Sequence, residues 1–147
     1  MSAQTLSLGL PQEFKPVCQY VMRNGRPDDV QILDEFLWNQ SGVVYVRMYG
    51  EKVVYIGVTD GLLSKRIRAH LHGISAARPG TASRRYLDWA EGKQITIAAY
   101  RPEPVHVLGR TIKIHRSIEA ALIAEFQQPS RELTSSGGPD CWFVART

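Results

Sequence analysis

The chain has 147 residues, of which 44% are hydrophobic and 22% are charged, and its formal net charge is +4. This length suits one domain with its own core, and the composition is that of an ordinary globular protein. No apolar run reaches the roughly 20 residues that a membrane-spanning helix needs. The first residues lack the basic and apolar regions of a signal peptide, and Cys18 and Cys141 are too few for a disulfide framework. We therefore expect a cytoplasmic protein with no membrane partner.

The first 40 residues predict an extension with little regular structure. Residues 1–26 are expected to be irregular because they carry prolines and a glycine. Residues 28–40 predict a short helix, because acidic residues suit its N-terminus and Ile32, Phe36 and Leu37 supply an apolar stripe.

A β-hairpin is predicted next, because two runs of β-branched and aromatic residues, 42–49 and 53–59, flank a Gly-Glu-Lys turn. The cross-strand pairs expected for a three-residue turn are Tyr49 with Val53, Arg47 with Tyr55, and Tyr45 with Gly57. Tyr45 and Tyr55 then lie diagonally on one face, and Gly57 leaves open space beside Tyr45. A turn with an even number of residues would put the two tyrosines on opposite faces.

The rest of the chain predicts helices and strands in an α+β arrangement. The expected elements are a helix at 61–74, a helix near 82–91, a strand at 94–100, a hairpin within 105–114 around Gly109, and a helix at 117–127 that stops before Pro129. Residues 133–147 predict a tail in which Trp142 and Phe143 pack. The fold class is therefore a small antiparallel or mixed three-stranded sheet flanked by helices.

Three polar side chains fall on or beside apolar helix faces. In the helix at 61–74, Arg66 and His70 stand four residues apart and border the apolar stripe. Glu119 lies in the middle of the stripe of the helix at 117–127, where a carboxylate is costly unless it is paired or coordinates a cation. Each of these three side chains also has a purely structural interpretation. Arg66 can extend to solvent, His70 can make one hydrogen bond, and Glu119 can pair with Arg66.

Taken together, these features resemble the GIY-YIG nuclease family in order and approximate spacing. The matching residues are VVY at 43–45, YIG at 55–57, Arg66 and His70, and Glu119 with Leu122 and Ile123. The resemblance spans residues 43–132, behind the extension at 1–40. The sequence departs from the family pattern in two places. The first triplet is VVY rather than GIY, and the asparagine that often follows the helical glutamate and a proline is absent from residues 129–132.

The resemblance implies a metal-dependent endonuclease that hydrolyses DNA phosphodiester bonds with one Mg²⁺ or Mn²⁺ in each active site. Glu119 would be the metal ligand. Tyr45 would be the general base for the attacking water, and His70 would accept the proton of Tyr45. Arg66 would stabilise negative charge on phosphorus, and Tyr55 would orient water or phosphate.

Residues 60–88 are rich in basic side chains, which predicts a face that contacts DNA phosphates without reading sequence. The residues assigned to substrate binding are Gly57, which lets the backbone approach, and Lys65, Arg68, Arg78, Arg84 and Arg85. Basic patches on small proteins are often only solvated, so the charge alone identifies no partner. The expected substrate is double-stranded DNA, cut by a monomer or a homodimer.

The sequence leaves the subclass of nuclease open. Residues 1–40 and an insertion between Arg78 and Arg116 resemble those of small restriction-type enzymes, which recognise sequence through such additions. A homing, repair or toxin nuclease is an alternative. A catalytically weak or silent nucleic-acid-binding module is another, which the missing asparagine favours and the retained polar residues oppose. A purely structural domain would leave Glu119 unexplained.

Overall fold

The structure is a computed structural model that describes residues 11–75 and 82–133. Its main element is a five-stranded sheet, antiparallel throughout, with the strand order β2-β1-β5-β3-β4. The strands are β1 (Lys15–Arg23), β2 (Arg26–Ile32), β3 (Ser41–Tyr49), β4 (Lys52–Leu62) and β5 (Gln94–Tyr100). The helices are α1 (Glu35–Trp38), α2 (Leu63–Ser75), α3 (Ala82–Ala90) and α4 (His115–Leu133). A separate two-stranded ribbon consists of β6 (Val105–Val107) and β7 (Arg110–Ile112).

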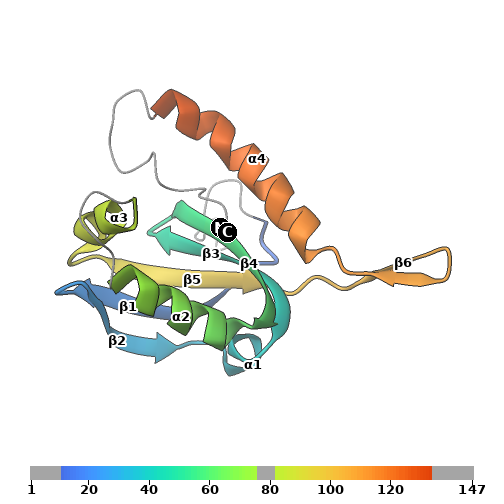
Figure 1. The fold of residues 1–147 in the computed structure, drawn as a ribbon, viewed down its shortest axis with the longest axis horizontal. Coiled ribbons are helices and arrows are strands. Elements are labelled where there is room, and N and C mark those ends of the chain that lie inside the picture. The colour runs from blue at the N-terminus through green and yellow to red at the C-terminus, as the bar shows by residue number, and fades with distance from the viewer. Residues whose placement is uncertain (1–10, 76–81, 134–147) are drawn as a thin grey trace.

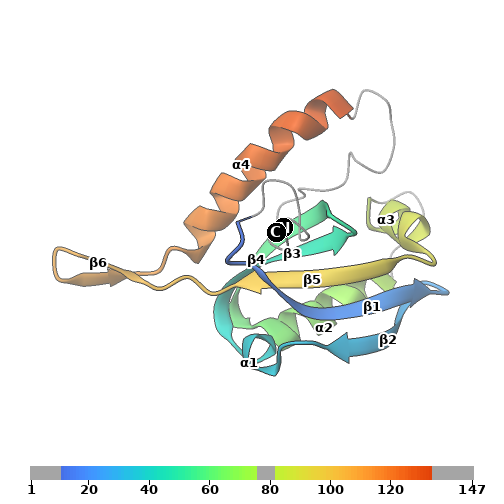
Figure 2. The same cartoon turned by 180° about the vertical axis from the view of Figure 1, so that it is seen from behind.

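The helices pack on the sheet in two places. Helix α2 lies across one face of the sheet, and α4 runs past β3 and β4 (Figure 1). Strands β1, β3, β4 and β5 form the core, to which each contributes side chains that are almost entirely buried. Leu63 and Ile67 of α2 and Leu122 of α4 complete it. The β6–β7 ribbon extends away from this body in both views (Figures 1 and 2).

The predicted α+β class with an antiparallel sheet and flanking helices is confirmed, and β3, β4 and β5 are its three expected strands. The prediction for the N-terminal extension was wrong, because β1 and β2 add two strands to that sheet. In β1, Val17, Cys18, Tyr20 and Met22 are buried, and the strand pairs with β5 on one side and β2 on the other. This role depends on pairing with a strand some 75 residues along the chain, which local composition does not reveal.

The prediction of a helix at 28–40 was also wrong over most of that range. Residues up to Ile32 belong to the edge strand β2, whose side chains are mostly exposed and so show no apolar alternation. Only α1 is helical, and the Asp34 carboxylate caps it by accepting a hydrogen bond of 3.0 Å from the backbone N–H of Leu37.

The β3–β4 hairpin has the expected register around the tyrosines, but its turn length differs from the expected one. The turn has two residues rather than three, and Tyr49 pairs with Lys52 instead of Val53. An irregularity between Arg47 and Met48 then shifts the register by one residue. The bulge compensates for the even-numbered turn, so Tyr45 still pairs with Gly57 and Arg47 still pairs with Tyr55.

The remaining elements lie close to their predicted positions, with one correction. Helix α4 continues to Leu133, although Pro129 takes one backbone donor out of the helix. Cys141 and the expected packing of Trp142 and Phe143 lie outside the described residues. Within the described segments, no helix combines the length and the apolar character that crossing a lipid bilayer requires.

Candidate active site

Two tyrosines from neighbouring strands meet over a glycine. Tyr45 of β3 is fully buried and Tyr55 of β4 is nearly so, and their ring centroids lie 6.1 Å apart. A Cβ atom at Gly57 would come within 2.7 Å of the Tyr45 hydroxyl oxygen and within 2.8 Å of the Tyr55 ring. Gly57 therefore makes room for the two rings. The space that the sequence analysis expected to be open beside Tyr45 is filled by these side chains.

Helix α2 brings a guanidinium to this pair. Arg66 is half-buried, and its Nε donates a hydrogen bond of 3.3 Å to the hydroxyl of Tyr45. This hydrogen bond is the main reason why the pKa of Arg66 is raised above its ordinary value, and the phenol of Tyr55 adds to the rise. Leu63 and Ile67 hold this part of α2 against the sheet, so the predicted orientation of Arg66 beside the apolar stripe is confirmed.

A second arginine lies beneath the site, and the sequence analysis gave it no role. Arg47 is only 3% exposed, and its guanidinium carbon lies 4.5 Å from the ring centroid of Tyr55 and 5.0 Å from that of Tyr86. Burial alone would lower the pKa of Arg47, but the surrounding phenols, with Tyr86 first, keep the pKa above its ordinary value. Its position two residues after Tyr45, on the same strand face, was the available signal.

His70 lies against Arg47. The Nη2 atom of Arg47 lies 2.8 Å from Nδ1 and 2.9 Å from Nε2 of His70, and a neutral imidazole accepts one hydrogen bond from it. The His70 ring also packs edge-on to Tyr55 at 5.0 Å. Burial, together with the charges of Arg47 and Arg66, lowers the pKa of His70 to about 3. The imidazole is therefore neutral at neutral pH and is a poor proton acceptor.

Glu119 lies on α4 as the sequence predicts, and it is buried with 7% of its surface exposed. Within the described part of the chain, its Oε2 atom has no hydrogen-bond partner. A buried carboxylate oxygen without a partner is costly, so its presence points to a ligand that supplies the missing interaction. The alternative of a direct ion pair with Arg66 does not account for this free oxygen.

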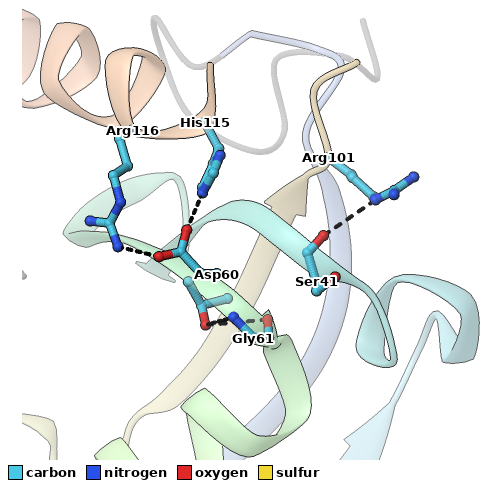
Figure 3. Close-up of polar contacts among 7 residues, drawn as sticks. Ser41, Asp60, Gly61, Arg101, His115 and Arg116 are labelled. Carbon is cyan, nitrogen blue, oxygen red and sulfur yellow. Dashed lines mark hydrogen bonds and ion pairs between the residues drawn. The ribbon is translucent and has the colours of Figure 1, made fainter. Parts of the chain in front are cut away.

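Three residues, named here the Asp60 cluster, tie α4 to the end of β4. The Asp60 carboxylate accepts hydrogen bonds from Nε2 of His115 at 2.5 Å and from Nη2 of Arg116 at 2.6 Å (Figure 3). The hydrogen bonds from Arg116 and His115 lower the pKa of Asp60 to about 2. His115 and Arg116 precede Glu119 by four and three residues, so the cluster fixes the helical turn that presents Glu119.

Arg116 also connects the two parts of the site electrostatically. The hydrogen bond to Asp60 is the main reason why the pKa of Arg116 is raised, while the negative charge of Glu119 raises it further and the positive charge of Arg66 opposes the rise. Glu119 and Arg66, from different helices, therefore both act on one guanidinium. The sequence analysis missed the Asp60 cluster, although the spacing of His115 and Arg116 from Glu119 along a helix was a signal.

The basic residues assigned to substrate binding have different surroundings. Lys65 and Arg85 are exposed. The guanidinium of Arg68 lies 5.5 Å from the ring centroid of Trp38, and Arg84 pairs with Asp88 at 3.3 Å. The remaining residue of this set, Arg78, lies outside the described residues.

Comparisons with known proteins support the fold. No protein-family model matches the sequence, and no curated protein matches it either. A mutant of bacteriophage T4 EndoII is 19% identical with a TM-score of 0.56, and the match covers 78% of this chain and 88% of that chain. Restriction endonuclease HPY188I in complex with product DNA is 18% identical with a TM-score of 0.48, over 80% of this chain and 76% of that chain. The chain therefore has a fold similar to that of EndoII.

Proposed function

We propose that this protein is a divalent-metal-dependent DNA endonuclease with a GIY-YIG-type active site. The observation that carries the proposal is the buried Glu119 carboxylate, whose Oε2 has no partner among the described residues. The hydrogen bond from Arg66 to Tyr45 supports the proposal, since it brings together a candidate general base and a cation for the same reaction. The fold similarity to EndoII, whose name describes an endonuclease, agrees with it.

The donor set around Glu119 fits Mg²⁺ or Mn²⁺ rather than Zn²⁺, which proteins hold through three or four side-chain ligands. In the described part of the chain, no three His, Cys, Asp or Glu side chains lie close enough to hold a metal. Mg²⁺ commonly binds proteins through one or two carboxylates and keeps several waters, which suits Glu119 as a single ligand. When bound, such an ion would supply Lewis-acid stabilisation to the phosphate and to the leaving 3′ oxygen.

Tyr45 is the proposed general base. Arg66 donates a hydrogen bond to its hydroxyl and so stabilises negative charge on the phenol oxygen. The phenolate would take the proton of the attacking water while the new bond to phosphorus forms and the bond from phosphorus to the 3′ oxygen breaks. Arg66 would also stabilise the added charge on the phosphate oxygens, and solvent would protonate the departing 3′ oxygen.

His70 and Arg47 are proposed to position this machinery. The sequence analysis gave His70 the role of accepting the Tyr45 proton, but its low pKa and its contact with Arg47 favour a neutral, positioning role. The Arg47 guanidinium packs on the Tyr55 ring, so it fixes the phenol that we assign to orienting water or phosphate. Gly57 allows the two rings to approach each other, and the exposed Lys65 and Arg85 are available to DNA phosphates.

The subclass that we favour is a restriction-type enzyme acting on double-stranded DNA. One active site cuts one strand, so a palindromic site would need two copies of the chain or two encounters. The test is incubation of the protein with supercoiled plasmid, with and without Mg²⁺ or Mn²⁺. Discrete fragments that require the metal are expected. A mobility shift without cutting would contradict the proposal and favour a silent binding module, and a smear would contradict sequence specificity.

A further inference from the structure

The β6–β7 hairpin stands apart from the main sheet. Its pairs are Val105 with Ile112, His106 with Thr111, and Val107 with Arg110, and neither strand pairs with the main sheet. Every residue of its two strands is exposed, and it projects well beyond the body of the protein in both views (Figures 1 and 2). An isolated two-stranded ribbon is marginally stable in water, so a partner is expected to complete it.

The tip of this hairpin presents an apolar side chain at a conformational cost. Leu108 and Gly109 form the two-residue turn with φ values of +52° and +73°, as a type I′ turn requires. Asn or Gly normally occupies the first of these positions, because a leucine Cβ is strained at positive φ. Leu108 is 88% exposed, more than any other large hydrophobic residue described. Neither packing nor turn geometry explains a leucine here.

Both ends of the hairpin are fixed to the body next to α4. Before β6, Nε of Arg101 donates a hydrogen bond of 3.3 Å to the carbonyl oxygen of Ser41 (Figure 3). After β7, His115 and Arg116 bind Asp60. Arg101, Ser41, Asp60 and His115 also line one small cavity of about 110 Å³. The hairpin therefore leaves the body at a defined place, one helical turn from Glu119.

The charge around the hairpin suits a polyanion. Between residues 101 and 116 the cations are Arg101, Arg110, Lys113 and Arg116, and the acidic residue is Glu103. The exposed apolar surface of Val105, Val107 and Ile112 lies within this basic stretch. A basic ribbon with an apolar tip has the chemistry of proteins that insert apolar wedges between base pairs while cations contact the phosphates.

From these observations we propose that the β6–β7 hairpin enters a groove of double-stranded DNA and inserts Leu108 between two base pairs. This inference rests on the proposed function, since DNA is the partner in both. A two-stranded ribbon fits a DNA groove. The His106–Thr111 pair lies on the ribbon face opposite to the Val107–Arg110 pair. The polar face would contact base edges, and the cations of the ribbon would contact phosphates. The inserted side chain unstacks one base step and unwinds the duplex there.

The variant Leu108→Asn tests this cleanly, because Asn-Gly is a preferred type I′ turn and the hairpin keeps its fold. The matched control is Phe36→Asn, which removes a 68% exposed apolar side chain from α1 instead. Each protein is added in EDTA to relaxed plasmid with a metal-independent topoisomerase, and the linking number is then measured. Affinity for a fluorescent duplex is measured by anisotropy, and self-association by sedimentation velocity.

The expected result is that the wild-type protein and Phe36→Asn shift the linking number, while Leu108→Asn shifts it little and binds the duplex about tenfold more weakly. A Leu108→Asn protein that unwinds and binds like the wild type would overturn the inference. So would a change in its sedimentation without a change in DNA binding, which would make the hairpin a contact between copies of the chain. If the wild-type protein cuts plasmid but Leu108→Asn changes nothing, only the inference fails. If the wild-type protein neither binds nor cuts, the proposed function fails with it.

Discussion

The two halves of the candidate site differ in how their polar groups are satisfied. On the sheet side, Tyr45 accepts a hydrogen bond from Arg66, and His70 is hydrogen-bonded to Arg47. On the α4 side, Glu119 is buried with a carboxylate oxygen that has no partner in the described structure. The two polar groups named in the first half are paired in the folded protein, whereas the second half holds a buried carboxylate oxygen without a partner among the described residues.

Both halves are preorganised, but by different parts of the molecule. The tyrosine half is fixed by the core of the protein, because strand register, burial and Gly57 leave its rings little freedom. The carboxylate half is fixed by the Asp60 cluster, in which Asp60 and Arg116 are mostly exposed. Electrostatic groups that are set in place before the reaction stabilise a transition state at no further cost of reorganisation.

Within the tyrosine half, the largest effect is expected at Arg66. Arg66→Ala removes the cation that contacts Tyr45, so the rate of plasmid nicking should fall by about 10²–10³. Affinity for DNA in EDTA should fall much less. Single-turnover nicking and anisotropy measure the two quantities, and Arg23→Ala on the distant β1 is the control. A loss confined to salt-sensitive binding would make Arg66 a phosphate-positioning residue and contradict its assignment.

A smaller effect is expected where the two rings meet. Gly57→Ala places a Cβ 2.7 Å from the Tyr45 ring, so both rings must shift in a packed core. We expect about 1–3 kcal/mol of destabilisation and a loss of about 10²-fold in rate at most, from misplaced catalytic groups. Thermal unfolding and nicking rates measure these effects. Gly61→Ala is the matched control in the same strand, because its Cβ meets open space. Equal behaviour of the two variants would show that ring placement is unimportant.

The carboxylate half should respond more mildly to loss of its support. Asp60→Asn removes the charge that binds His115 and Arg116, so Glu119 becomes less well placed. We expect a rate loss of about tenfold, partly restored by a higher Mn²⁺ concentration. Asp88→Asn, which removes a different exposed ion pair, is the control. An unchanged dependence of rate on Mn²⁺ would separate the Asp60 cluster from the metal site.

The smallest effect concerns stability rather than rate. The pKa of His70 is about 3 in the folded protein and about 6.5 ordinarily. The unfolded state therefore binds more protons between these values, and stability is lost as pH falls from 6.5 towards 3, by up to about 1.4 kcal/mol per pH unit. Denaturant unfolding at several pH values in this range gives the free energy of unfolding as a function of pH. This free energy should change less steeply with pH for His70→Gln than for the wild type or His106→Gln. Equal slopes would show that His70 is protonated without penalty in the folded state.

The sequence predicted those parts of the site that depend on local periodicity. Glu119 stood out because it interrupts an apolar stripe, and Arg66 and His70 because they border one. The Tyr45–Gly57 pairing followed from strand alternation, although a bulge and not the turn length produced it. These features need only the geometry of one helix or one hairpin, and a sequence contains that information.

The parts that were missed depend on contacts between distant segments. Strand β1 is defined by its pairing with β5, and the Asp60 cluster joins residues 55 and 56 positions apart in the chain. The buried Arg47 looks like an ordinary surface residue until Tyr86 of α3 is packed on it. The contact of His70 with Arg47 was not foreseen for the same reason, since it joins residues 23 positions apart on a strand and a helix.

We infer that Glu119 completes the site by binding a divalent cation. The most direct measurement is Mg²⁺- and Mn²⁺-dependent nicking of supercoiled plasmid by Glu119→Gln, compared with Glu125→Gln on the exposed side of the same helix. We predict that Glu119→Gln loses metal-dependent cutting while its thermal unfolding and its affinity for DNA in EDTA stay unchanged, and that Glu125→Gln cuts like the wild type. Undiminished cutting by Glu119→Gln would contradict the account.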